Sequence, residues 1–456
     1  MSRRISVSGL GYLGLVHAIC LAHEGFEVVG IDIDRHRVDG LRKGRLPFFE
    51  PGLEEVFRAA RRRITFTHRV ADLADCDVHF LCVGTPQSAD GRETDTSHVF
   101  DAALGLVPYL KPDALVVGKS TVPVGTAALL STALRQAAGR EVRLAWSPEF
   151  VRQGRCVHDT LNPDRIVYGT GGSRPQDDVD VLDEIFAPQY SRGTQRLVVD
   201  YATAELVKVA ANAFLATKIS FINAVAELCE QSGADVVALA EAIGMDARIG
   251  HQFLSAGLGF GGGCLPKDLA GFQARAEEYG AEPAVTMMRA VEQVNGKART
   301  NVVELALDMC DGDLMGKNIT VLGAAFKPHT DDVRESPALD VARICDALGA
   351  RVTVHDPLAI DNAKKAHPRL RYERDVLRAA RGADVVLHLT EWPDYRELDP
   401  ESLGRVVRRR RIIDGRHGLK PEQWSRAGWS YRAWGRPLAS TFFDVDVDAQ
   451  AWAVGG

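Results

Sequence analysis

A glycine-rich turn near the start of the chain most strongly limits the folds that this sequence can adopt. Ile5–Ser8 has the apolar character of a short strand, and Gly9-Leu-Gly-Tyr-Leu-Gly14 follows it directly. A predicted helix then runs to about Glu24, and a second predicted strand, Glu27–Ile31, ends at Asp32. In this context the Gly-x-Gly-x-x-Gly turn is the fingerprint of a dinucleotide-binding βαβ unit.

The βαβ unit predicts a site for NAD. Its glycines let a pyrophosphate approach the N-terminus of the first helix, whose N–H groups and dipole favour an anion. Asp32 would accept hydrogen bonds from the ribose hydroxyls and repel a 2′-phosphate, which favours NAD over NADP. Arg35 and Arg37 follow closely and weaken that preference. The alternative is a structural turn of the same type without a cofactor.

The length of the chain predicts how many domains it has, and its charge argues against some classes of binding partner. A chain of 456 residues predicts two or three domains. The net charge of −6 argues against a nucleic-acid coat protein or a protein that binds anionic membranes. Because the N-terminus lacks a signal-peptide pattern and no uninterrupted apolar run is long enough for a membrane span, we expect a cytoplasmic protein.

Polar tips follow several further strands of the first region. The predicted strands are Asp77–Val83, Ala114–Gly118, Val142–Trp146 and Arg165–Tyr168. Three of them end in tips rich in Gly, Pro, Ser, Thr and Lys: Gly84–Pro86, Lys119–Pro123 and Ser147–Phe150. Since ligands bind beyond the carboxyl ends of parallel strands, we expect these tips to line one crevice, although each tip alone could be ordinary turn chemistry.

The pattern becomes helical from Tyr201 to about Met309. Residues 202–223 contain neither glycine nor proline, which predicts a long helix connecting two domains. Lys208 and Asn212 are four residues apart on this helix and therefore share a face, either as functional groups or as a solvated surface. Further helices are expected over Glu227–Ala242 and Ala284–Ala306.

A third region from Lys317 repeats the strand and helix pattern of the first. Its predicted elements are the strands Asn318–Leu322, Arg351–Asp356, Ala383–Thr390 and, last, Arg411–Asp414, with a helix over Ala338–Leu348. The turn at Gly323 keeps one glycine of the fingerprint, so it is a poor dinucleotide site, but Lys327 lies where an anion could bind. The arginines 408–411 are expected to be a solvated strand entrance, and the tail beyond Pro437, with Trp452, has no interpretable pattern.

Gly257-Leu-Gly-Phe-Gly-Gly-Gly-Cys264-Leu-Pro-Lys-Asp268 is the stretch with the clearest chemistry. Its glycines allow a backbone to lie close to a ligand, and Pro266 suits the first turn of a helix. A thiol at a helix N-terminus, with Lys267 three residues on, should have a depressed pKa and be a good nucleophile. The alternative is a surface loop with an incidental cysteine. The seven other cysteines (20, 76, 82, 156, 229, 310 and 345) are scattered and are expected to fill apolar core positions.

An NAD site combined with a reactive cysteine indicates an oxidation through a covalent aldehyde-level intermediate. Hydride leaves a thiohemiacetal to give a thioester, which water then cleaves. The residues alone support no narrower conclusion.

Five segments in order resemble the UDP-glucose/GDP-mannose dehydrogenase family, over about residues 3 to 420. The segments are Gly9–Gly14, Lys119–Pro123, Glu205–Asn212, Gly259–Asp268 and Ala325–Pro337. Residues 248–254, Arg-Ile-Gly-His-Gln-Phe-Leu, are similar to the UDP-glucose branch. The resemblance implies an α/β fold class: two doubly wound, Rossmann-like domains joined by a long central helix and a helical dimerisation region. It places the NAD-binding domain at 1–200, the central domain at 201–310, a nucleotide-sugar-binding domain at 311–440 and a tail at 441–456.

The implied reaction is the four-electron oxidation of a hexose C6 alcohol to a uronic acid, with two NAD and no metal. Cys264 would be the nucleophile, and Asp268 would orient water or share proton transfer with Lys208. Lys208 and Asn212 would stabilise the oxyanion, Thr121 would hold a water, and Glu149 could be the base for thioester hydrolysis. Arg248 would enter the neighbouring subunit's site, which implies a dimer through the central helices. The net charge and the lack of a long apolar run argue against nucleic-acid and membrane partners.

The resemblance also assigns the two ligands to named residues. The cofactor-binding set is Gly9, Gly11, Tyr12, Leu13, Gly14, Asp32, Arg37, Val83, Gly84, Thr85, Pro86, Ser120, Thr121, Gln153, Lys267 and Arg334. The substrate-binding set is Glu149, Phe150, Lys208, Asn212, Arg248, Ser255, Gly257, Gly259, Phe260, Gly261, Phe326, Lys327 and Arg416.

Two positions depart from the family pattern. Gln153 stands where the family usually has glutamate, which favours Glu149 as the hydrolytic carboxylate and leaves open a slower final step. Gly263 stands where serine or tyrosine is frequent, which loosens the loop and could alter substrate choice. UDP-glucose is the expected substrate, followed by TDP-glucose and GDP-mannose. A two-electron dehydrogenase and an inactive nucleotide-sugar-binding regulator remain as alternatives, the latter disfavoured because Cys264, Lys208 and Asp268 are all present.

Overall fold

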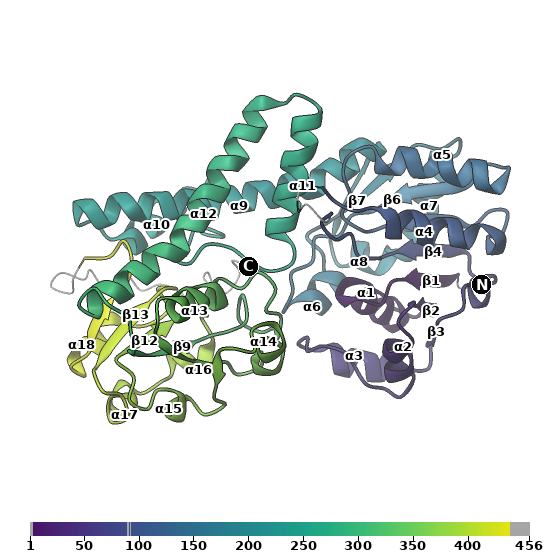
Figure 1. Ribbon diagram of the computed structural model, residues 1–456. Coiled ribbons are helices and arrows are strands. Elements are labelled where there is room, and N and C mark those ends of the chain that lie inside the picture. Colours follow the sequence, from purple (N-terminus) through teal and green to yellow (C-terminus); the bar gives the residue numbers. More distant parts are fainter. Residues whose placement is uncertain (1–2, 89–90, 92, 438–456) are drawn as a thin grey trace. The chain divides into compact units, whose positions relative to one another are not determined.

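The computed structural model describes residues 3–88, 91 and 93–437. The expected tail 441–456, including Trp452, lies outside the described residues. The chain divides into two compact units (Figure 1). The N-terminal unit comprises the residues up to Asn212 and Ala270–Gly280, and the C-terminal unit comprises Ala213–Leu269 and the residues from Ala281 onward.

An eight-stranded sheet in the order β3-β2-β1-β4-β5-β6-β7-β8 forms the centre of the N-terminal unit. The strands run parallel, with Ser6 opposite Val29 on one side and His79 on the other, except that β7 is antiparallel to β6. The predicted strand Glu27–Ile31 is confirmed residue for residue. The strand bounds are β1 Arg4–Ser8, β2 Glu27–Ile31, β3 Ile64–Thr67, β4 Val78–Leu81, β5 Leu115–Gly118, β6 Arg143–Trp146, β7 Arg165–Thr170 and β8 Gln195–Val199.

Helices cover both faces of this sheet. Successive residues of a strand point to opposite faces, so they pack into two separate hydrophobic cores. Phe80 packs in a core with α1 and α3, whereas Leu81 packs in a second core with α4 and α5. This arrangement confirms the predicted doubly wound fold. The helices are α1 Tyr12–His23, α2 Arg35–Arg42, α3 Leu53–Ala60, α4 Ser97–Leu106, α5 Thr126–Ala138, α6 Cys156–Leu161, α7 Pro175–Ile185 and α8 Ala187–Ser191, with 3₁₀ helices η1 Val70–Leu73 and η2 Val107–Tyr109.

A continuous helix of 32 residues, α9 Tyr201–Ser232, follows the N-terminal sheet. The predicted single helix over Glu227–Ala242 is wrong, because α9 ends at Ser232, Gly233 follows with a φ of +75°, and a new helix begins after Asp235. The Asp235 carboxylate caps this helix by accepting from the Val237 N–H at 2.7 Å. The remaining central helices are α10 Val236–Gly244, α11 Leu265–Glu278 and α12 Glu282–Met309.

Helix α9 is the one helix in the described part of the chain that is long and apolar enough to cross a membrane by length and composition alone. This is weak evidence for a span, because the core helix of a soluble protein passes the same test. Glu205 and Lys208 of α9 are buried within the N-terminal unit, which is the behaviour of a core helix.

A second sheet, six-stranded and parallel, forms the centre of the C-terminal unit in the order β11-β10-β9-β12-β13-β14. The predicted strands Asn318–Leu322 and Arg411–Asp414 are confirmed residue for residue, but β14 follows the strand that was expected to be last. The strands are β9 Asn318–Leu322, β10 Arg351–His355, β11 Arg371–Tyr372, β12 Val385–His388, β13 Arg411–Asp414 and β14 Ser430–Arg432. The helices are α13 Pro337–Ala347, α14 Ile360–Ala366, α15 Val376–Ala379, α16 Pro393–Arg396, α17 Pro400–Gly404 and α18 Pro421–Arg426.

The backbone of the turn after β9 is bound by a carboxylate of the protein itself. Asp356, at the end of β10, accepts from the N–H groups of Ala324 at 2.7 Å and Ala325 at 3.0 Å. A side chain at Gly323 would overlap Thr390. Two donors that a cofactor phosphate would need are therefore already bound to a carboxylate, in line with the prediction of a poor dinucleotide site.

Candidate active site

The turn after β1 has the geometry that a dinucleotide requires. A Cβ at Gly9 would lie 2.8 Å from the Cys82 carbonyl oxygen, and a Cβ at Gly14 would overlap the Gly9 carbonyl. Gly11, in contrast, faces open space and is the N-cap of α1, with no side chain bound to the free N–H groups. Two glycines thus pack the turn and the third leaves the helix N-terminus accessible, which fits a pyrophosphate at that point.

Asp32 occupies the position expected of the ribose-binding acid. Its buried carboxylate accepts from the Leu10 N–H at 2.7 Å and from the Arg37 guanidinium at 2.9 Å. Arg37 is therefore already paired with a carboxylate, which removes the objection that it favours a 2′-phosphate. Ile33, next to Asp32, is 95% exposed, and this apolar surface beside the turn was not anticipated from the sequence.

The three predicted tips lie side by side, because β4, β5 and β6 are neighbours in the sheet. The Ser120 hydroxyl donates to the Val83 carbonyl at 2.7 Å, and the Thr85 hydroxyl donates to the Thr121 carbonyl at 2.8 Å. Lys119 extends the connection to the third tip by donating to the Ser147 carbonyl at 3.3 Å. The three tips therefore lie next to one another at one edge of the sheet, as a shared crevice would require.

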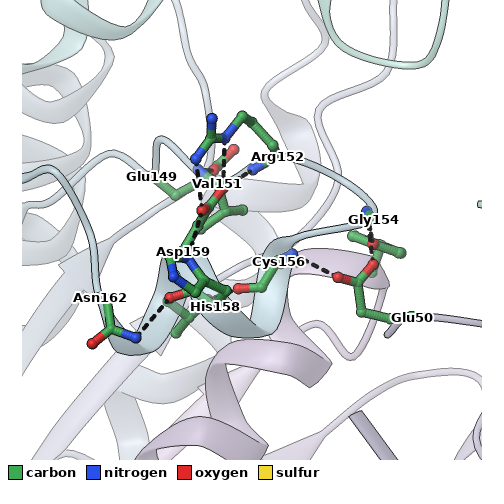
Figure 2. A network of polar contacts seen from close by, with 11 residues as sticks. Glu50, Glu149, Val151, Arg152, Gly154, Cys156, His158, Asp159 and Asn162 are labelled. Carbon is green, nitrogen blue, oxygen red and sulfur yellow. Dashed lines mark hydrogen bonds and ion pairs between the residues drawn. The ribbon is translucent and has the colours of Figure 1, made fainter. Parts of the chain in front are cut away.

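A network of carboxylates holds the loop that follows β6 (Figure 2). Glu50 accepts from the N–H groups of Gly154 at 2.8 Å and Cys156 at 2.6 Å, and Arg152 makes a two-pronged ion pair with Asp159. Burial alone would raise the pKa of Asp159, but Arg152 more than offsets this and the pKa is lowered. Sequence reasoning missed Glu50 and Asp159, since neither belongs to a recognisable catalytic pattern.

Glu149 and Lys208 come together within the N-terminal unit. The Lys208 ammonium lies 3.5 Å from a Glu149 carboxylate oxygen and 5.7 Å from the centre of the Phe150 ring. Lys208 is 5% exposed and Asn212 is 8% exposed, so the alternative of a solvated helix face is wrong. The second oxygen of Glu149 accepts from the Val151 N–H at 2.7 Å, which fixes the carboxylate beside the lysine.

Glu205, one turn before Lys208, anchors α9 to α5. Its carboxylate accepts from the N–H groups of Gly125 at 2.7 Å and Ala127 at 2.6 Å, at the N-terminus of α5. Burial raises the pKa of Glu205 to about 7, although these two N–H groups act in the opposite direction. The group therefore changes charge close to neutral pH.

We expect the stability of the protein to fall as the pH rises through the pKa of Glu205. A carboxyl whose pKa is raised on folding contributes fully below its unfolded value, and this contribution is lost as the pH passes the folded value of about 7. Relative to Glu205→Gln, the wild-type free energy of unfolding should therefore drop between pH 5 and pH 8, by up to about 3 kcal/mol. Urea denaturation of both proteins at each pH measures this, and parallel pH profiles would contradict it.

The glycine loop of the C-terminal unit packs tightly against protein groups. A Cβ would lie 2.7 Å from the Gly415 carbonyl at Gly257 and 2.6 Å from the Phe326 ring at Gly262. At Gly259 it would overlap the Asn295 side chain, and at Gly261 it would overlap the Glu335 carbonyl. The sequence suggested that these glycines serve a ligand, and the structure adds that the unit's own packing requires them.

Replacement of Gly261 by alanine should therefore destabilise the protein. The new Cβ would meet the backbone oxygen of Glu335, which cannot rotate away, so the loop must move. We expect a loss of about 1–3 kcal/mol, as for other overpacked sites. Gly296→Ala in α12 is the matched control, because its Cβ would meet nothing and should be neutral or slightly stabilising. Equal melting temperatures for the two variants would refute the packing role of Gly261.

Cys264 directly precedes α11, as predicted, and is exposed, whereas the other seven cysteines are buried. Its carbonyl accepts from the Asp268 N–H at 2.8 Å, which forms the first turn of the helix. The Lys267 ammonium lies 2.8 Å from the buried Asp268 carboxylate. The cation that the sequence places near the thiol is therefore engaged by Asp268.

Arg416 joins three segments of the predicted substrate site. Its guanidinium donates to the carbonyls of Leu389 at 3.0 Å, Gly259 at 3.3 Å and Phe326 at 3.4 Å. The loop that carries Arg416 is anchored by the buried Asp414, which pairs with His388 at 2.8 Å. Sequence reasoning missed this histidine–aspartate pair, although the strand that ends at Asp414 was predicted.

The remaining predicted substrate residues lie in the C-terminal unit with different degrees of exposure. Phe260 is buried, and its N–H donates to Asn295 at 2.8 Å. Ser255 and Lys327 are half-buried, and the Lys327 ammonium lies 5.5 Å from the Phe326 ring. The Arg248 side chain, in contrast, is 89% exposed and pairs with Asp246 at 2.6 Å.

A dinucleotide site on one sheet and an exposed cysteine at the start of a helix define an oxidoreductase that uses a nicotinamide dinucleotide. Models of the UDP-glucose/GDP-mannose dehydrogenase family match the chain in three parts: the NAD binding domain at residues 3–189, the central domain at 202–297 and the UDP binding domain at 320–421. The chain belongs to this family and is an NAD-dependent nucleotide-sugar dehydrogenase.

Known proteins of this family are similar over nearly the full chain. UDP-glucose 6-dehydrogenase YwqF of Bacillus subtilis is 40% identical over 438 residues, which cover 95% of this chain and 97% of that protein. UDP-glucose 6-dehydrogenase of Pseudomonas aeruginosa is 37% identical, with 96% and 98% covered. The structure of a UDP-glucose dehydrogenase from Pyrobaculum islandicum superposes with a TM-score of 0.87 at 37% identity, covering 96% of this chain and 98% of that one.

Proposed function

We propose that this enzyme oxidises C6 of UDP-glucose to the carboxylate of UDP-glucuronate. The observation that carries the proposal is the exposed Cys264 at the start of α11, in a chain 37–40% identical to UDP-glucose 6-dehydrogenases. A cysteine nucleophile has no use in a simple alcohol oxidation, but it is needed to hold an aldehyde for a second hydride loss.

The two oxidations balance as follows. The C6 alcohol loses a hydride and a proton to become an aldehyde, and the Cys264 thiolate adds to its carbonyl carbon. The resulting thiohemiacetal alkoxide loses a second hydride to become a thioester, and one water cleaves the carbon–sulfur bond to release the carboxylate, the thiolate and two protons. NAD, when bound at the turn after β1, accepts one hydride in each oxidation, so two NAD are reduced per sugar.

The buried polar groups of α9 suit the charge that develops on the substrate oxygen. The ammonium of Lys208 and the amide of Asn212 are both protected from water, where a hydrogen-bond donor stabilises an oxyanion most effectively. Asp268 would share proton transfer with Lys208, and Thr121 would hold the hydrolytic water.

Glu149 is the carboxylate that we propose for thioester hydrolysis. It is held by the Val151 N–H beside Lys208, whereas position 153 carries a glutamine, which cannot act as a base. Gln153 could lower the rate of the final step without removing its base.

We further propose a homodimer in the cytoplasm, formed through the central helices. Leu206, Phe214, Phe221 and Leu228 recur every seven or eight residues on α9, so they follow one face of the helix. Each of these side chains is between 44% and 69% exposed. A row of exposed large apolar side chains on one helix face is typical of a protein–protein interface. Arg248 would reach the neighbouring subunit's site, in keeping with its exposed side chain.

Substrate choice is tested by comparing kcat/KM for UDP-glucose, TDP-glucose and GDP-mannose under identical conditions. We expect UDP-glucose to be preferred by about tenfold or more, which corresponds to about 1.4 kcal/mol of differential transition-state binding. A higher kcat/KM with GDP-mannose or TDP-glucose would overturn this assignment while leaving the reaction chemistry intact.

A further inference from the structure

The turn Arg334–Pro337 lies directly against the last glycines before Cys264. The Gly262 N–H donates to the Arg334 carbonyl at 3.1 Å, and a Cβ at Gly261 would meet Glu335 and Pro337. Glu335 itself has a φ of +46°, a strained conformation for a residue with a side chain. The backbone of this turn thus packs closely against the glycines that precede Cys264, where a side chain would not fit.

The guanidinium of Arg334 occupies the space that a side chain at position 263 would fill. A Cβ on Gly263 would lie 2.5 Å from the central carbon of the guanidinium and 2.7 Å from each of its two Nη atoms. The charged group therefore rests on the residue next to Cys264. A side chain at position 263 would displace it.

Asp332 fixes the orientation of this guanidinium. Arg334 donates through Nε to both Asp332 oxygens at 3.0 Å and through Nη2 at 2.6 Å, while Nη1 has no acceptor among the described residues. The pKa of Arg334 is raised, chiefly by these hydrogen bonds and to a smaller extent by the Cys264 thiolate. The arginine is thus a permanent cation with one nitrogen available beside the cysteine.

We infer that Arg334, seated on Gly263, is the positioning residue that stabilises the Cys264 thiolate, in place of Lys267. This inference rests on the proposed role of Cys264 as nucleophile and assigns Arg334 a function besides its expected contact with NAD. Two ion pairs lie in the segments next to the thiol in this unit: Arg334 with Asp332, and Lys267 with Asp268. Each cation is paired with a carboxylate, but Arg334 uses only Nε and Nη2 for Asp332 and keeps Nη1, whereas Lys267 has a single ammonium, which lies against Asp268.

The pH dependence of Cys264 alkylation tests this inference without turnover. Iodoacetamide reacts with the thiolate, and because the other cysteines are buried, the peptide containing Cys264 reports the rate directly by mass spectrometry. We expect Arg334→Met to raise the midpoint of the titration by about one unit, so that alkylation below the midpoint slows about tenfold. Arg334→Lys should retain most of the effect, and Gly263→Ala should shift the midpoint in the same direction as Arg334→Met by displacing the guanidinium.

Two charge-removing controls complete the design. Lys267→Met should shift the midpoint less than Arg334→Met, and Arg343→Met should not shift it, since Arg343 is an exposed arginine of α13 that pairs with Asp340. An unchanged titration in both Arg334→Met and Gly263→Ala would overturn the inference, as would a larger shift in Lys267→Met. Because neither sugar nor NAD is present, these outcomes are independent of whether UDP-glucose is the substrate.

Discussion

Replacing Cys264 by alanine should abolish formation of the uronic acid while NAD still binds. The nucleophile that holds the aldehyde would be lost, but the turn after β1, with the open Gly11, is distant in sequence and retains its own packing. We expect kcat to fall on the order of 10⁴-fold or more, as for removal of a covalent nucleophile. The measurement is uronate production, with NAD binding followed by calorimetry on the same sample.

Cys264 is exposed, so its removal should leave the melting temperature nearly unchanged and keep the kinetic result interpretable. Cys310→Ala provides a matched control, because that thiol is buried at the end of α12 and is remote from the predicted chemistry. It should lose some stability and retain activity. Full turnover by Cys264→Ala would rule out covalent catalysis.

Replacing Lys208 by alanine should lower kcat on the order of 10²-fold or more, the usual effect of removing an oxyanion donor. The ammonium is buried beside Glu149, so the variant would lose both the donor and the cation that compensates this carboxylate. If Lys208 acts on the transition state, kcat should fall more than KM rises. Steady-state kinetics with UDP-glucose separate the two effects.

Lys297→Ala is the control for the loss of a helical lysine. Lys297 belongs to α12 and its exposed ammonium pairs with Glu227 of α9, so its removal should change kcat less than about twofold. A loss within a few-fold for Lys208→Ala as well would show that the buried ammonium has a structural role only.

The runs of apolar residues in the sequence predicted the strands that lie inside the two sheets. Glu27–Ile31 and Asn318–Leu322 are buried after their first residue and pair with neighbours on both sides, so burial leaves a continuous apolar signal. The strands β3, β8, β11 and β14 lie at sheet edges and were not predicted. The residues of β8 are largely exposed, and β11 has two residues, so neither carries a recognisable pattern.

The site was predictable where its chemistry is local in sequence. The spacing of Lys208 and Asn212 and the position of Cys264 before a helix follow directly from short segments. Glu50 was missed because it acts on Gly154 and Cys156, more than a hundred residues away. Asp356 likewise binds the backbone of the turn after another strand, and Asp414 binds the backbone of the loop after its own strand. Any buried acid could serve these functions, and no motif encodes them.

The central claim is that one enzyme removes four electrons from C6 through a thioester on Cys264. The most direct measurement incubates limiting UDP-glucose with excess NAD and compares the NADH formed with the sugar consumed. Two NADH per UDP-glucose, with UDP-glucuronate as the product, is the predicted result. One NADH per sugar, with an aldehyde as the product, would contradict the account.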